Sequence, residues 1–230
     1  MKYLIVNADD FGASTGINRA IAECHTYGVV TSTSVMVNGA AAREASRMMR
    51  DLPQLSVGLH FDVLGEAITE TSDLSDHAVV RQEFARQLER FHELTGQWPT
   101  HVDSHRHAHW RAGLFPVFQE MVAPQGVSLR GDGRVRFAGG FYGQPEWLVT
   151  DLTCLSVSAF LSVACEDVEA GWLEMGCHPG YVTAGFDSVY NIERQTEVAT
   201  LKDPSLRVLL ADAGYVLASY KDYASQECLL

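Results

Sequence analysis

The sequence is poor in basic residues, in paired cysteines and in long apolar runs, and each shortage excludes a class of function. Lysine and arginine number 17 against 29 aspartates and glutamates, a formal charge of -12 that repels a nucleic-acid backbone. The five cysteines contain no Cys-x-x-Cys pair, so we expect reduced thiols. No apolar run reaches membrane-spanning length, and the N-terminal segment lacks the apolar core and cleavage site of a signal peptide. We therefore expect a cytoplasmic protein that binds neither nucleic acid nor membrane, and a neutral or cationic small-molecule substrate.

The remaining composition is that of a globular α/β protein. Hydrophobic residues make up 47% and charged residues 20% of 230 residues, and nothing resembles a linker, so we expect a single domain over 1–230. Strand-like and helix-like segments alternate along the chain. The expected strands are 2–7, 31–37, 55–60, 100–104, 126–130, 172–176 and 214–218. The expected helices are 14–27, 40–50, 78–94, 112–121, 146–165 and 193–213, the last interrupted at Pro204. Seven βα units predict a distorted or incomplete (β/α) TIM-like barrel, with a doubly wound open sheet as the alternative.

Histidines are concentrated in the segment 100–109. His101, Asp103, His105, His107 and His109 all have the same parity, so an extended chain would project them from one face. Burying this many imidazoles without partners is costly. This indicates that the row of side chains, the histidine stripe, contacts water, a substrate or a metal ion. A solvated histidine-rich loop is the alternative interpretation.

Two other expected strands also end at potential metal ligands. The first strand runs into Asp9 and Asp10, and the strand 55–60 ends at His60. Because active sites of parallel α/β proteins lie at the carboxyl ends of the strands, these side chains are expected to meet. Three protein ligands leave coordination positions open for water and substrate, as catalysis requires. Each signal alone is weak, because paired aspartates often cap helices and a lone histidine is usually structural.

Five motifs occur in an order that identifies a family. They are Asn7 to Gly12, Thr31 to Gly39, Gly58 to His60, His101 to His105, and Cys177 to Gly180. With these motifs the chain resembles the YdjC-like carbohydrate deacetylases, close to the chitooligosaccharide deacetylases, from Met1 to about Tyr220. The resemblance implies a distorted (β/α) barrel, a homodimer, and removal of N-acetyl groups from amino sugars with one divalent metal ion. It also implies Asp10, His60 and His105 as metal ligands and Asp9 as the general base.

The chemistry of amide hydrolysis agrees with these residue types. It needs an activated water to attack the acetamide, stabilisation of the oxyanion, and a proton for the departing amine. His178 follows the strand 172–176, and we expect it to be the acid that protonates the amine. Arg130 ends the strand 126–130 and can pair with Asp9, keeping it ionised and oriented. The two histidines and one carboxylate suit zinc, while magnesium would prefer more oxygen ligands, so both metals remain candidates.

The other polar residues near these motifs receive weaker predictions. Asp103 is expected to orient a ligand imidazole or to cap the loop. His107 and His109 are expected to contact substrate, metal or solvent, and His101 to be structural. Cys177 beside His178 suggests a thiol nucleophile, but neighbouring strand-end residues point to opposite faces, so we disfavour this reading.

One segment that is expected to wall the substrate groove is short. The segment 61–77 is shorter than the corresponding segment of family members, so we expect a reduced groove wall and little dependence on substrate length. Trp110, Phe141, Tyr142 and Trp147 are candidates for stacking on sugar rings or for core packing. Two alternative functions stay open: a metal-dependent hydrolase of another amide or ester, and a barrel that binds metal and sugar without turnover.

Overall fold

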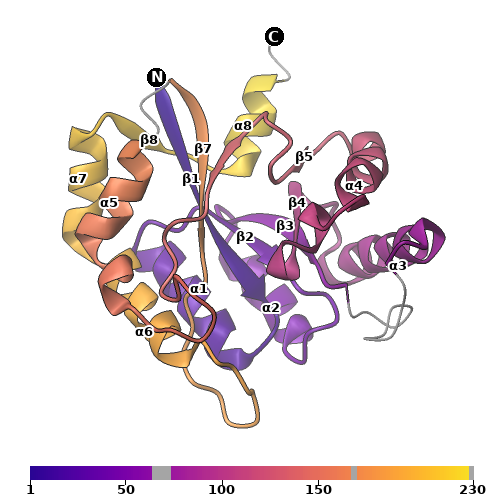
Figure 1. Ribbon diagram of the computed structural model, residues 1–230, viewed down its shortest axis with the longest axis horizontal. Coiled ribbons are helices and arrows are strands. Elements are labelled where there is room, and N and C mark those ends of the chain that lie inside the picture. Colours follow the sequence, from indigo (N-terminus) through magenta and orange to yellow (C-terminus); the bar gives the residue numbers. More distant parts are fainter. Residues whose placement is uncertain (64–73, 167–169, 228–230) are drawn as a thin grey trace.

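The protein, seen here as a computed structural model, is built around one parallel β-sheet (Figure 1). The structure describes residues 1–63, 74–166 and 170–227. The strands are β1 (Lys2–Phe11), β2 (Ser32–Val35), β3 (Ser56–Phe61), β4 (His101–Ser104), β5 (Ser128–Leu129), β6 (Arg136–Ala138), β7 (Gly171–Cys177) and β8 (Tyr215–Leu217). Their order is β5-β4-β3-β2-β1-β7-β6, and β8 pairs with the first residues of β1.

This strand order confirms the incomplete barrel. Successive strands β1 to β5 are neighbours, as in a (β/α) barrel, and the sheet continues from β1 through β7 to β6. Within the described residues no pairing joins β5 to β6, so the barrel is open there. A doubly wound sheet would reverse its strand order at a switch point, and that alternative is wrong.

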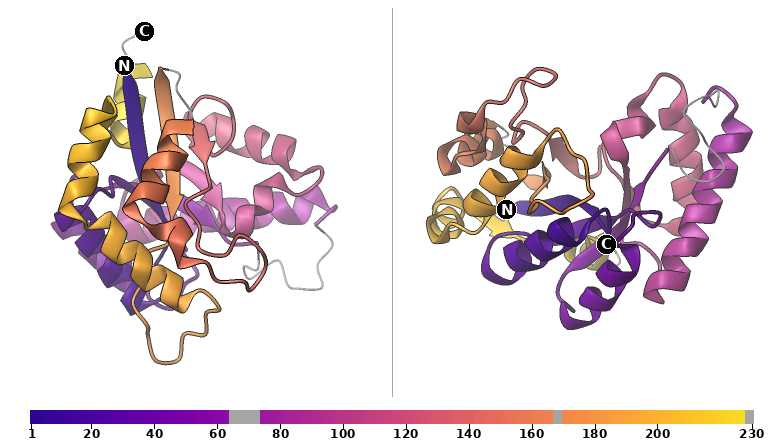
Figure 2. Two further views of the ribbon diagram at one scale, coloured as in Figure 1. Left: turned by 60° about the vertical axis from the view of Figure 1, so that its left-hand side comes forward. Right: turned by 90° about the horizontal axis from the view of Figure 1, so that it is seen from below.

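Helices surround the sheet on its outer side (Figures 1 and 2). They are α1 (Thr15–Tyr27), α2 (Ala42–Met48), α3 (His77–Thr95), α4 (Leu114–Val122), α5 (Val157–Glu166), α6 (Asn191–Leu201), α7 (Pro204–Asp212) and α8 (Tyr220–Glu227). Short 3-10 turns occupy Met49–Asp51, His105–Trp110, Ala123–Gln125 and Leu152–Leu155. Among the described residues no helix has both the length and the apolar character needed to cross a membrane.

Local sequence signals explain where the best-predicted elements begin and end. The Ser14 hydroxyl accepts the backbone N–H of Ile17 at 3.2 Å and so caps α1. Asp76 caps α3 in the same way, and Gly96 ends it with φ of 71°, a left-handed conformation that suits glycine. β1 is buried from Leu4 to Phe11, as expected of a central parallel strand covered on both faces.

Three expectations about the elements are wrong. The described residues form eight strands rather than seven, because β6 was not predicted: three residues are too few for a recognisable pattern. The expected helix 146–165 forms only from Val157, since Glu146 and Val149 close a turn in which Leu148 has φ of 62°. The strand 126–130 shrinks to Ser128–Leu129.

The pairing register brings the polar strand ends to one edge of the sheet. Ala8 lies opposite Cys177 of β7 and Thr33 of β2, while His60 lies opposite Asp103. The residues that follow these positions therefore gather at the carboxyl edge, where barrel active sites are built. α8 lies near the opposite end, where β1 begins (Figure 1).

Candidate active site

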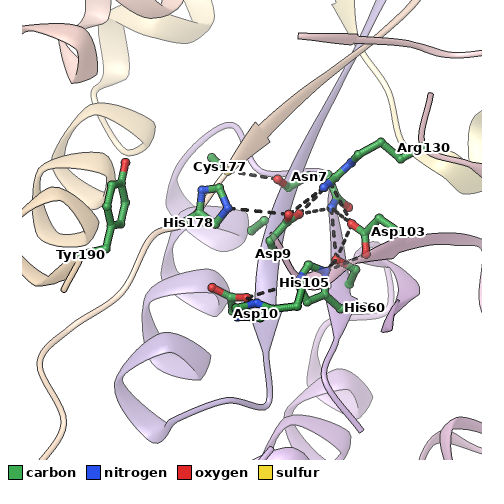
Figure 3. A network of polar contacts seen from close by, with 12 residues as sticks. Asn7, Asp9, Asp10, His60, Asp103, His105, Arg130, Cys177, His178 and Tyr190 are labelled. Carbon is green, nitrogen blue, oxygen red and sulfur yellow. Dashed lines mark hydrogen bonds and ion pairs between the residues drawn. The ribbon is translucent and has the colours of Figure 1, made fainter. Parts of the chain in front are cut away.

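The adjacent carboxylates Asp9 and Asp10 have separate partners (Figure 3). Asp10 has φ of 70°, an uncommon conformation for a residue other than glycine, and it re-aims the side chain at the end of β1. Its Oδ1 lies 3.3 Å from Nε2 of His60 and 3.2 Å from Nδ1 of His105. The three side chains expected to bind metal therefore converge, although they come from three different strand ends.

The second oxygen of Asp10 is held by an arginine that the sequence analysis missed. Arg194 on α6 donates to Oδ2 at 2.6 Å, which leaves Oδ1 facing the two histidines. Burial raises the pKa of Asp10, but Arg194 and the imidazoles outweigh it and hold the pKa well below its usual range. The carboxylate is thus ionised at neutral pH.

His60 is oriented by Asp103. Its Nδ1 donates to Oδ1 of Asp103 at 2.7 Å, and the Ser34 hydroxyl donates to Oδ2 at 2.8 Å. Asp103 was expected to orient a ligand imidazole, and the imidazole that it contacts is that of His60. Burial lowers the pKa of His60, but the surrounding carboxylates raise it well above its usual range. A cation on Nε2 would take the place of the proton there.

Asp9 is paired with Arg130 inside the barrel. The guanidinium donates to both oxygens of Asp9, at 2.8 and 2.7 Å. The Asn7 side-chain amide donates a third hydrogen bond, to Oδ1, at 2.8 Å. Burial raises the pKa of Asp9, but Arg130 outweighs it and the net shift is downward. Arg130 also contacts Asp103 and Glu174, which fixes the plane of its guanidinium.

His178 lies on the other side of Asp9 (Figure 3), with Nε2 3.7 Å from Oδ2. Its backbone is clamped from α6: the N–H donates to Glu197, and the carbonyl accepts from Arg194 at 3.1 Å. Burial lowers the pKa of the imidazole, so the ring is neutral at rest. Tyr142 and Tyr190 meet it edge-on, with ring centres 5.6 and 5.9 Å away.

The histidine stripe is not extended, which corrects the expectation from residue parity. β4 ends at Ser104, and a short 3-10 segment follows with φ of 51° at Arg106 and 48° at His107. His101 is buried against Tyr220, with ring centres 3.9 Å apart, and burial lowers its pKa to about 4. His101 is thus a structural residue.

His107 and His109 differ in their surroundings. His109 is buried, and its ring contacts the Ser104 hydroxyl and the Arg130 carbonyl, so the expected contact with metal, substrate or solvent is wrong. His107 stacks on Trp110 at 4.3 Å and lines the cavity.

Cys177 is isolated from the chemistry. Its thiol is buried and donates to the Asn7 backbone carbonyl at 3.3 Å. Burial raises the pKa of this thiol well above its usual range, so a thiolate nucleophile is disfavoured.

A cavity of about 660 Å³ opens over these groups. That volume is typical of small-molecule sites. The potential metal ligands, Asp9, His178 and Arg194 line it, together with a largely apolar wall: Met36, Phe137, Tyr142, Trp147, Phe186 and Val189. The cavity can therefore hold a substrate with an apolar face against the polar groups.

The other substrate-groove expectations have mixed outcomes. Phe141 is fully buried and packs on Phe160, so it belongs to the core. Trp110 packs against His107 and Phe137. Most of the segment 61–77 lies outside the described residues, because these exclude 64–73; the reduced wall stays a prediction.

The contribution of α6 was not predicted from the sequence. Tyr190, Arg194 and Glu197 follow one another at intervals of four and three, which places them on one face of a helix. That face supports both Asp10 and His178. The spacing was visible in the sequence, but nothing local connects it to Asp10, which lies 184 residues away.

Comparisons with known proteins agree with the geometry. A family model described as YdjC-like protein matches residues 3–212. The chain is 35% identical over 258 aligned positions to the chitooligosaccharide deacetylase of Escherichia fergusonii, covering 96% of this chain and 99% of that protein.

Solved structures share the fold. A protein of Enterococcus faecalis V583, described as a candidate for cellobiose-phosphate cleavage, superposes with a TM-score of 0.82 at 23% identity, covering 96% of this chain and 98% of that one. A CE4 esterase of Streptococcus mutans superposes with a TM-score of 0.65 at 12% identity, covering 95% and 85%.

Proposed function

The chain belongs to the YdjC-like protein family, and on that premise we propose that it is a metal-dependent carbohydrate deacetylase. It hydrolyses the N-acetyl group of an amino sugar, such as a short chitooligosaccharide, to a free amine and acetate. The observation that carries the proposal is the division of the adjacent carboxylates: Oδ1 of Asp10 faces two imidazoles, while both oxygens of Asp9 face the Arg130 guanidinium and Oδ2 also faces a third histidine.

The proposed metal ligands fit one divalent ion. Asp10, His60 and His105 each offer one atom, and the three atoms lie within 4.8 Å of one another. Asp103 accepts a hydrogen bond from Nδ1 of His60, the ring nitrogen that does not face Asp10. Carboxylates commonly orient metal-bound histidines in this way. A second group, Asp9, His60 and Asp103, also meets this distance. Arg130 and other donors already occupy both oxygens of each of its carboxylates, whereas Oδ1 of Asp10 is left facing only the two imidazoles. Two nitrogens and one oxygen favour zinc or another first-row ion over magnesium.

A divalent ion held by this trio supplies Lewis acidity, polarising the acetamide carbonyl and making a nearby water more acidic. The chain supplies the base. Oδ1 of Asp9 already accepts from Asn7 and Arg130, while Oδ2 accepts one N–H of Arg130 and keeps a lone pair. We assign the water's proton to Oδ2, since the low pKa of Asp9 keeps it ionised.

His178 supplies the proton that the amine needs. Its Nε2 lies 3.7 Å from Oδ2 of Asp9, so the proton taken there can be relayed through the imidazole to the departing nitrogen. Glu197 and Arg194 hold its backbone, which fixes the ring over the cavity. The water thereby contributes its oxygen and one hydrogen to acetic acid, which ionises to acetate on release, and its other proton to the amine. Both catalytic groups return to their starting states.

Acetate release tests the proposal. The protein is supplied with zinc, cobalt or magnesium and offered N-acetylated mono- and disaccharides, N-acetyl amino acids and acetyl esters. We expect acetate from the amino sugars, loss of activity with a chelator, and recovery with metal. Faster release from another amide or an ester would favour the broader hydrolase, and sugar binding without any release would favour a non-catalytic barrel. The homodimer implied by the family is tested separately by light scattering.

A further inference from the structure

One wall of the cavity is a loop between β6 and α5 that carries the most exposed tryptophan among the described residues. Tyr142, Gln144 and Trp147 of this loop line the cavity. The Trp147 side chain is 74% exposed, compared with 52% for Trp98. A large apolar side chain left in water beside a catalytic site indicates a binding surface.

Backbone hydrogen bonds close this loop. The N–H of Asp151 donates to the Gly143 carbonyl at 2.8 Å, and the N–H of Val149 donates to the Glu146 carbonyl at 3.0 Å. Leu148 has φ of 62°, so the tip holds a turn that a branched side chain rarely adopts. Strain of this kind persists only where the surrounding contacts impose it.

Side chains from α6 and the segment before it impose that conformation. Glu193 is 1% exposed, and its Oε1 accepts from the Gln144 amide at 2.8 Å and from the Thr150 hydroxyl. The Tyr190 hydroxyl accepts the N–H of Gly143 at 2.7 Å. Both ends of the loop are therefore tied to the helix that supports Asp10 and His178. Because the loop is already ordered, ligand binding costs little of its conformational entropy.

Three aromatic side chains of this wall line the cavity: Tyr142, Tyr190 and Trp147. Tyr142 and Tyr190 stack on each other, 4.6 Å apart, and both rings meet His178. Trp147 follows Tyr142 by five residues in the same loop and is more exposed, 74% against 37%. Its indole is therefore available to a part of the ligand that the Tyr142 and Tyr190 pair does not cover.

We propose that Trp147 is the stacking platform for the sugar unit that adjoins the reacting one. The inference rests on the proposed function and deepens it. A pyranose ring with equatorial hydroxyls presents its C–H bonds on two apolar faces, and an exposed indole on a rigid loop matches such a face. The occupant of this subsite is therefore a second hexose unit, and the enzyme acts better on a disaccharide than on a monosaccharide.

The test compares Trp147→Ala with Trp98→Ala on N-acetylglucosamine and on its β-1,4-linked disaccharide. Trp98 stacks on His92 and is also exposed, so it is the matched control. We expect Trp147→Ala to lower kcat/KM about tenfold for the disaccharide and less than about twofold for the monosaccharide, the usual scale of one aromatic contact. Trp147→Phe is expected to retain most of the activity, and Trp98→Ala all of it.

Equal losses on both substrates would mean a structural role, and no loss would mean that the indole does not touch the ligand; either result overturns the proposal. A change in oligomeric mass with unchanged kinetics would make Trp147 a subunit contact and overturn it as well. Binding is followed independently by indole fluorescence in Asp9→Asn, where we expect the disaccharide to quench emission and Trp147→Phe to remove the quenching. If the wild-type protein releases no acetate, the proposed function fails, while this titration still decides whether Trp147 binds the sugar.

Discussion

Replacing Asp9 with Asn separates the roles of the two adjacent carboxylates. The asparagine side chain has the same shape but cannot accept a proton from water at neutral pH. We expect kcat to fall about 10²- to 10⁴-fold, the scale of a lost general base, which corresponds to about 3 to 5 kcal/mol of barrier.

The structure also limits the side effects of this substitution. Asp9 is the acceptor in all three of its side-chain hydrogen bonds. The asparagine carries an N–H2 group in place of one carboxylate oxygen, so this new donor must face a guanidinium N–H of Arg130 in one of them. One lost hydrogen bond and one unfavourable contact predict a stability loss of about 1 to 3 kcal/mol. Arg130 keeps Asp103 and Glu174 as counter-ions, so it is not left as an unpaired buried charge. The variant is therefore expected to fold.

The assay measures acetate release, metal content and thermal unfolding on the same preparations. Asp9→Asn is expected to keep about one metal ion per chain, because it is outside the Asp10, His60 and His105 group. Asp212→Asn, at an exposed position, is the control. Retention of more than about a tenth of wild-type kcat by Asp9→Asn would refute the assignment of the base. So would a loss of metal that excess metal reverses together with the activity.

Four further outcomes are expected. Asp10→Asn lowers metal affinity at least about tenfold, measured by metal analysis after dialysis, because it removes the only charged ligand of the trio. Burial raises the folded-state pKa of Glu197 to about 8 from 4.5, so the folded protein holds an extra proton between these values and loses stability as pH rises through them. Glu197→Gln removes that loss, at most about 1.4 kcal/mol per pH unit, and melting curves from pH 5 to 8 that stay parallel for the two proteins would contradict it. Cys177→Ala keeps kcat within about twofold and costs about 1 kcal/mol of stability, checked by kinetics and chemical denaturation. The kcat/KM for a trisaccharide stays within about tenfold of that for a disaccharide, and a steep rise in a length series would show an intact outer groove.

Several elements were predictable because their signals are local. Ser14 and Gly96 mark helix ends by backbone chemistry that needs no distant partner. The apolar run before Asp9 and Asp10 predicted a buried strand, and the structure confirms it. A helix was predicted over the segment 146–156 because its composition permits one. Contacts of Gly143, Gln144 and Thr150 with Glu193 and Tyr190 hold this part of the chain as a loop.

The sequence by itself determined which side chains stand at the strand ends, and therefore the Asp10, His60 and His105 trio, since parallel strands place their carboxyl ends at one edge. The positive φ values at Asp10, Arg106 and His107 were decided by tertiary structure, and those at Arg106 and His107 ended the extended histidine segment in a turn. Tertiary structure alone also decided which partner orients each group: Arg194 for Asp10, Asp103 for His60, Glu197 for His178. Such partners depend on how helices pack around the barrel, because a buried charge binds whichever complementary group the packing brings within hydrogen-bond distance, however far away it lies in the sequence.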